Sequence, residues 1–173
     1  MNLNALKELL PGVALSDSSY YRLVIASYAP QIDDIAQSIL HSWRYNPKGE
    51  FGVLYLSMSP ECAYREKLKQ VYNNAQSLLP QVIGKFSVGS TRCLDLTQPS
   101  FQETLGLSPS QLIDPNDFSV TQSIAREARN LGFEIIIAPS AIGDYCKNLV
   151  VFRDRLNPPS YCIVDKQSIR SYP

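Results

Sequence analysis

Apolar residues recur along the chain with the periods of helices and strands. Residues 3–10 carry leucines at helical spacing and stop at a Pro-Gly pair, which predicts a short opening helix that serves as a docking or partner element. Apolar side chains repeat in the same way over residues 32–43 after Pro30. This spacing predicts a second, amphipathic helix.

Two further helices carry recognisable end signals. Ser59 and Pro60 suit the N-cap and the first turn of a helix that we expect to reach about Leu79. Residues 119–131 have helical periodicity and are followed by Gly132, a residue typical of the position just after a helix end. Between these predicted helices lie short apolar segments that do not have helical periodicity.

The segments between the predicted helices are rich in β-branched and aromatic residues, and this composition predicts strands. We expect 81–88 and 92–96 to pair across a turn at Gly89-Ser90, and the pair Pro158-Pro159 to form a rigid turn before the last strand. The predicted strands are 20–26, 52–57, 81–88, 92–96, 133–138, 148–152 and 161–164. The fold class is α+β, and 173 residues suffice for one domain.

Charge argues against several classes of partner. The 16 basic and 16 acidic side chains cancel and form no block, so the field that draws proteins to nucleic acids or anionic membranes is missing. No apolar run approaches the roughly 20 residues that span a bilayer, and the first residues lack the features of a signal peptide. We expect a cytoplasmic protein with no direct contact to nucleic acid or membrane.

Cysteine and histidine are too few and too scattered for a metal site. The four cysteines are far apart without a C-x-x-C motif, and His41 is the single histidine, so neither zinc ligation nor a disulfide framework is expected. We predict no metal and four reduced, mostly buried thiols: Cys62, Cys93, Cys146 and Cys162.

Polar residues in or beside strands are the candidates for a site. Each also has an ordinary structural interpretation: arginines extend to a sheet edge, turn residues are solvated, and tyrosines pack their rings while the hydroxyl reaches water. The candidates are Arg22, Arg44, Tyr45, Asn46, Tyr55, Ser57, Glu66, Ser140 and Asn148.

Glu66 has two competing interpretations. A helical wheel places Glu66 on the surface, nearly opposite the apolar positions of its predicted helix, which are Tyr64, Leu68, Val71, Tyr72 and Ala75. However, Cys62 and Ala63 are small, and they leave space for a ligand near the first turns of the helix. Periodicity alone favours the surface.

Several enzyme classes lack their motifs. A serine or cysteine hydrolase needs a base beside its nucleophile, but there is no G-x-S-x-G motif, and His41 lies near a predicted helix end where a cation is favourable without catalysis. Phosphate-binding loops of the P-loop and dinucleotide-binding types are also missing.

An ordered set of short motifs resembles one family. The segments "YYRLV", "WRYNPKGEFGVLYLSMSPECAYREKL", "LDLT", "TQSIAREARNLGFEIIIAPSA" and "KNLVVF" are similar, in this order, to the RES domain of bacterial toxins, named for its arginine, glutamate and serine. The resemblance implies one RES-like domain over residues 1–173, in which 1–17 form an N-terminal helical extension. It also implies a fold like that of ADP-ribosyltransferases.

The resemblance assigns roles by position. Glu66, Arg22 and Tyr55 match catalytic residues, and the glutamate would stabilise the cationic ribose that forms when nicotinamide leaves. Arginine suits the pyrophosphate of NAD, and tyrosine rings would stack on nicotinamide. The residues expected to bind NAD are Arg22, Arg44, Tyr45, Asn46, Ser57 and Ser140.

The implied activity is cleavage of the nicotinamide–ribose bond of NAD, by water or phosphate, with NAD as substrate and no prosthetic group. The implied partner is a helix-turn-helix antitoxin. His41 to Trp43, and Arg65 before the glutamate, depart from the residues common in the family. Two alternatives stay open: transfer of ADP-ribose to a protein, and a binding domain of the same fold without turnover.

Overall fold

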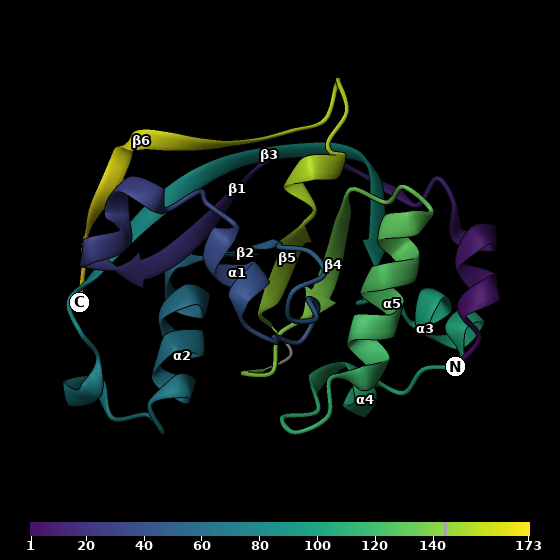
Figure 1. The fold of residues 1–173 in the computed structure, drawn as a ribbon, viewed down its shortest axis with the longest axis horizontal. Coiled ribbons are helices and arrows are strands. Elements are labelled where there is room, and N and C mark those ends of the chain that lie inside the picture. The colour runs from purple at the N-terminus through teal and green to yellow at the C-terminus, as the bar shows by residue number, and fades with distance from the viewer. Residues whose placement is uncertain (144) are drawn as a thin grey trace.

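The computed structural model describes residues 1–143 and 145–173. Strands and helices alternate, as the apolar pattern predicts, and the class is mixed α+β (Figure 1). The strands are β1 (Val13–Ile25), β2 (Leu54–Ser57), β3 (Gln81–Asp95), β4 (Ile135–Pro139), β5 (Lys147–Val151) and β6 (Tyr161–Tyr172). The α-helices are α1 (Ala36–Leu40), α2 (Pro60–Gln70), α3 (Pro99–Leu105), α4 (Pro109–Ile113) and α5 (Ser119–Asn130), and the 3₁₀ helices are η1 (Leu3–Leu9), η2 (Ala26–Gln31), η3 (Ala75–Ser77) and η4 (Arg153–Arg155).

The six strands form one sheet in the order β1-β2-β5-β4-β3-β6. An additional pairing of β1 with β3 closes the first five strands into a ring. The contact between β1 and β2 is a single pair, Tyr21 with Ser57, and β3 and β4 are the one parallel pair among the described strands. The junction of β1 and β2, beside α2, therefore has the shortest strand pairing in the ring.

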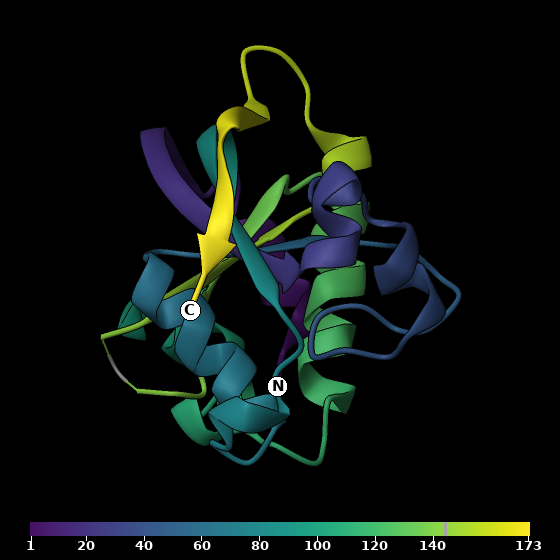
Figure 2. The same cartoon turned by 90° about the vertical axis from the view of Figure 1, so that its left-hand side faces the viewer.

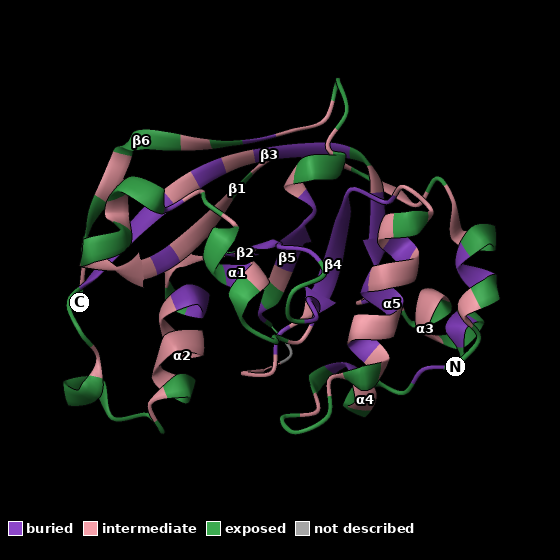
Figure 3. Ribbon diagram, in the orientation of Figure 1, coloured by how far each residue is buried: buried purple, intermediate pink, exposed green. Residues whose placement is uncertain are grey.

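Helices cover the ring on two sides (Figure 1). The long strands β1, β3 and β6 arch over the short strands β2, β5 and β4, with α2 at one end and α3, α5 and η1 at the other. The end of β6 reaches α2, where the rings of Tyr172 and Tyr64 pack edge-on with centroids 5.7 Å apart (Figure 2). Burial follows this arrangement, since β2, β3, β4 and the inner face of α5 consist mainly of buried residues (Figure 3).

Two apolar clusters hold the sheet and helices together. One cluster joins η1, α3, α4 and α5 to one face of the short strands and includes the fully buried Phe133, Phe152 and Leu6. The other fills the ring and includes Phe86, Leu54 and Leu149. Complete burial of a large apolar side chain contributes roughly 1.5 to 3 kcal/mol, so these clusters are the main support of the site described below.

The opening helix lies where its leucine spacing predicts it, as the 3₁₀ helix η1. The predicted helical extension 1–17 is wrong beyond Leu9, because β1 begins at Val13. Leu6 is fully buried against the helices of the same chain. Its apolar face therefore packs within this domain instead of being held out to a partner.

The predicted helix over residues 32–43 is also wrong in its length. Only the five-residue α1 lies within this range, and the 3₁₀ helix η2 precedes it. The Arg22 guanidinium donates hydrogen bonds to the carbonyl oxygens of Ile32 and Asp34, each at 3.0 Å. The Asp34 carboxylate accepts a hydrogen bond from the backbone amide of Ala36 at 2.7 Å. Helical hydrogen bonds there are replaced by bonds to side chains, and the helix starts later.

The predicted hairpin at Gly89-Ser90 is a third error, because β3 runs unbroken from Gln81 to Asp95. Gly89 faces Tyr161 of β6, and a Cβ placed on it would lie 2.8 Å from that ring. The glycine leaves room for an aromatic neighbour and does not turn the chain. In contrast, α5 is confirmed, with Gly132 at φ +83° after its end.

The prediction of four free thiols is half wrong. Cys62 in α2 and Cys146 before β5 form a disulfide, with Cα atoms 5.9 Å apart, whereas Cys93 and Cys162 are free and buried. The pair is 84 residues apart in sequence, and only packing α2 beside β5 brings the two together.

Within residues 1–143 and 145–173, no helix is long and apolar enough to cross a membrane. No group of three or more histidine, cysteine, aspartate or glutamate side chains is placed to hold a metal ion within those ranges.

Candidate active site

A cavity of about 510 Å³ lies between α2, the ends of the short strands and the loop after α1. Its size falls in the range of small-molecule sites. Six of the eight residues predicted for the site line it: Arg22, Arg44, Tyr45, Tyr55, Ser57 and Glu66. The remaining two, Asn46 and Ser140, lie behind lining residues and bond to them.

Glu66 is the single carboxylate among the residues that line this cavity. The hydroxyl of Ser140 donates to its Oε1 atom, and the side-chain amide of Asn148 donates to the same oxygen at 2.9 Å. The amide of Ile142 in turn donates to the Ser140 hydroxyl at 3.2 Å. A carboxylate from α2 is thus joined to residues at the ends of β4 and β5.

The surface position that the helical wheel predicts for Glu66 is wrong. The buried residues of α2 are Cys62 and Ala63, and Glu66 follows one turn later on the same face. Tyr72, which the wheel counts on the apolar face, lies beyond the helix end and is 96% exposed. The periodicity misleads because it runs past the end of α2.

The start of α2 is as predicted. Ser59 is the N-cap, its hydroxyl accepts from the amide of Cys62 at 3.1 Å, and Pro60 occupies the first turn. A cap of this kind contributes about 1 kcal/mol. Because these residues set where α2 begins, they place Glu66 in the second turn of the helix.

Positive charge surrounds the carboxylate. Arg22, Arg44, Lys67 and Lys69 line the cavity with it. Burial lowers the pKa of Arg22 to about 10, which leaves the guanidinium charged at neutral pH. Burial, and then the nearby charge of Arg22, also lower the pKa of Lys67. Two cations so close together are costly unless an anion joins them, and a bound phosphate group would meet that need.

Arg44 ties the loop after α1 to the segment that precedes α5. Its guanidinium donates to the carbonyls of Leu112 at 3.3 Å and Asp114 at 2.6 Å, and it lies 5.0 Å from the ring centroid of Phe118. A guanidinium has five donors, so these contacts leave some of them for a ligand.

Tyr45 and Asn46 are more deeply buried than binding residues usually are. Tyr45 is 2% exposed and Asn46 is fully buried. The Tyr55 hydroxyl accepts from the amide of Tyr45 at 2.9 Å and donates to Asn46 at 3.0 Å. Burial raises the pKa of both tyrosines, so both stay protonated at neutral pH. Tyr55 is the more exposed ring, whereas Tyr45 and Asn46 hold the wall in place.

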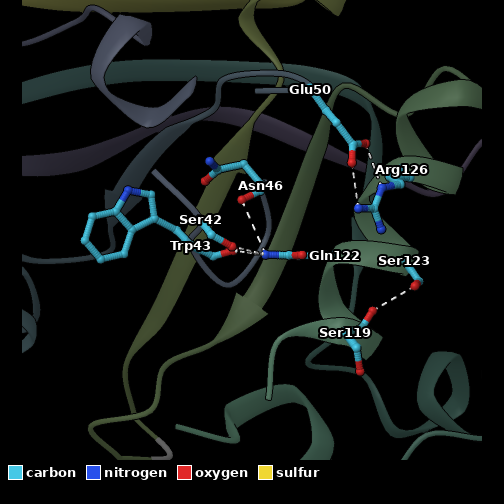
Figure 4. Close-up of polar contacts among 8 residues, drawn as sticks. All are labelled: Ser42, Trp43, Asn46, Glu50, Ser119, Gln122, Ser123 and Arg126. Carbon is cyan, nitrogen blue, oxygen red and sulfur yellow. Dashed lines mark hydrogen bonds and ion pairs between the residues drawn. The ribbon is translucent and has the colours of Figure 1, made fainter. Parts of the chain in front are cut away.

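The loop that carries these residues is fastened to α5 (Figure 4). The Gln122 side chain donates to the Ser42 hydroxyl at 2.9 Å and the Trp43 carbonyl at 2.8 Å. Glu50 and Arg126 form a two-bonded ion pair at 2.7 Å at the far end of the loop. The residues of the site wall are therefore positioned by a helix on the outside of the fold.

Comparison with known proteins places the chain in a family. The RES domain model matches residues 19–171. The chain belongs to the RES domain family. This agrees with the ordered motifs described above, whose first and last members lie within the matched region.

Two known proteins are also similar, one in sequence and one in fold. A Mycobacterium tuberculosis protein named probable NAD(+) phosphorylase is 31% identical over 111 residues, which are 63% of this chain and 52% of that protein. The chain thus spans about half the length of this curated relative. A chain in the crystal structure of the M. tuberculosis MbcT-MbcA toxin-antitoxin complex has a similar fold, with a TM-score of 0.76, 20% identity, and coverage of 99% of this chain and 93% of that chain.

Two lining residues received no role from the family resemblance. Asn148 is among the candidates named from the sequence, because asparagine is disfavoured in a strand of otherwise apolar residues. Lys67 follows Glu66 in the chain, but nothing in its spacing distinguishes it from the other charged residues of α2.

Proposed function

We propose that this protein cleaves the bond between nicotinamide and ribose in NAD. The observation that carries the proposal is the charge arrangement of the cavity, in which Glu66 is held by Ser140 and Asn148 within a wall of cations. A dinucleotide with a positive nicotinamide ring and a negative pyrophosphate has the complementary charges. The name of the M. tuberculosis relative supports the same substrate.

The chemistry follows from this arrangement. Nicotinamide leaves as a neutral base with the bonding electrons, and the ribose carbon becomes cationic. The Glu66 carboxylate would stabilise that charge, and Arg22 and Lys67 would hold the pyrophosphate. An oxygen of phosphate or water then bonds to the ribose carbon, which yields ADP-ribosyl phosphate or ADP-ribose.

The resemblance adds proposals about context. We infer an ADP-ribosyltransferase-like fold for one RES-like domain over residues 1–173, and a toxin that acts in the cytoplasm. A helix-turn-helix antitoxin is the proposed partner, and the toxin-antitoxin neighbour in the fold comparison supports a protein partner. Such a partner would restrain the enzyme by covering the cavity mouth near residues 44–49.

The test is incubation of the purified protein with NAD, with and without inorganic phosphate, followed by chromatography of the products. We expect nicotinamide release that rises with phosphate, together with ADP-ribosyl phosphate. ADP-ribose alone would indicate hydrolysis, and labelled protein would indicate ADP-ribosyl transfer. A melting-temperature shift with NAD but no nicotinamide would refute turnover and leave a binding domain.

A further inference from the structure

Asn148 and Ser57 face each other on neighbouring strands. The two residues are direct partners in the antiparallel register of β2 and β5, so their side chains share one face of the sheet. The Ser57 hydroxyl donates to Oδ1 of Asn148 at 3.0 Å. This bond turns the amide so that its Nδ2 group points to Glu66 and donates to Oε1 at 2.9 Å.

The carboxylate of Glu66 is consequently held from one side. Both described donors, Ser140 and Asn148, reach the same oxygen, Oε1. Within residues 1–143 and 145–173, the Oε2 atom of Glu66 accepts no hydrogen bond from the protein. A carboxylate fixed through one oxygen presents the other in a defined direction, which is the requirement for stabilising charge at one carbon atom.

The side chain of Glu66 needs this support because its helix does not supply it. Glutamate has three side-chain torsions and loses up to about 2 kcal/mol of rotamer entropy when it is fixed. The backbone of α2 sets the position of its Cα atom, but the contact with Asn148 links it to the sheet across 82 residues of sequence.

We propose that Asn148 is a positioning residue for Glu66 and that Ser57 sets the orientation of the Asn148 amide. The proposal deepens the proposed function, on which it rests. It gives Ser57 a role through Asn148 in place of the direct NAD contact that the family resemblance implies.

The first test separates positioning from substrate binding. In Asn148→Ala, the Glu66 carboxylate loses one of its two hydrogen-bond donors and is no longer held in one orientation. We therefore expect kcat to fall about 10- to 100-fold, while KM for NAD changes less than about threefold. The matched control is Asn157→Ala, which changes an exposed asparagine outside the cavity and should keep the parent rate. A rise in KM with unchanged kcat would overturn positioning, because it would show that Asn148 binds NAD directly.

The second test addresses Ser57. Ser57→Ala should lower kcat by a smaller factor than Asn148→Ala, because the amide is then free to rotate. Ser57→Thr keeps the hydroxyl and should recover most of the lost rate. Equal kcat in the alanine and threonine variants would refute the proposed link to Asn148.

A third measurement does not depend on turnover. The side-chain amide protons of Asn148 are observed by NMR, and the proton that bonds to Glu66 should move upfield in Glu66→Gln, since its acceptor loses a charge. An unchanged Asn148 signal would overturn the contact even if the parent enzyme is active. Failure of the parent to release nicotinamide would refute the proposed function instead, and the NMR result would still decide the contact.

Discussion

Opening the Cys62–Cys146 disulfide should destabilise the protein strongly. The bond closes a loop across 84 residues, and the chain-entropy model gives about 4.6 kcal/mol for a loop of that length. With an unfolding entropy of about 2.1 cal/mol/K per residue, this corresponds to a fall in Tm of about 13 °C for the 173-residue chain. Residual structure in the unfolded chain would make the measured shift smaller.

The measurement is thermal unfolding with and without a reducing agent. The matched variant is Cys62→Ala with Cys146→Ala, which should melt near the reduced parent and should not respond to the reductant. Thiol titration of the unfolded, non-reduced parent should count two free groups, Cys93 and Cys162. Four free thiols, or a Tm that ignores the reductant, would refute the reasoning.

The redox state also bears on the site. Cys62 is four residues before Glu66, and Cys146 is two residues before Asn148, so the bond joins both sides of their contact. A reducing cytoplasm opens most disulfides, and turnover assays therefore need a defined redox state. We expect the reduced parent to be slower as well as less stable.

Four further predictions concern the site. Glu66→Gln should lower kcat by about 10²- to 10³-fold with little change in NAD affinity, measured by nicotinamide release against an exposed control on the same helix, Glu61→Gln. Arg22→Ala should weaken NAD binding in calorimetry by about 1.5 to 3 kcal/mol, and equal affinity would remove this arginine from the site. Gln122→Ala should cost about 1 kcal/mol in urea unfolding, because it frees the loop from α5; an unchanged midpoint would contradict this anchoring. Co-expression with a helix-turn-helix protein from the adjacent reading frame should relieve growth arrest, and a chain that is harmless alone but consumes NAD in vitro would refute the toxin proposal.

Local sequence signals were sufficient to locate a helix or strand where contacts with the rest of the fold do not change the conformation of that segment. The N-cap at Ser59, the helix α5 with Gly132 after it, and the apolar strands β4 and β5 all lie where the pattern predicts them. The ordered motifs also led to the RES family, which the match over residues 19–171 confirms. Each of these signals is a short segment or an ordered series of short segments, so it can be read without knowledge of the fold.

Tertiary structure decided the features that depend on residues far apart in the chain. Arg22 shortened a predicted helix by bonding to its carbonyls, and Tyr161 gave Gly89 a place inside a strand instead of a turn. The direction of Glu66 depended on where α2 ends and on the sheet against which it packs. Its contact with Asn148 spans 82 residues and the disulfide spans 84. Periodicity reports which face of a segment is apolar, but it cannot report which distant side chain meets that face, because that pairing exists only once the chain has closed its sheet.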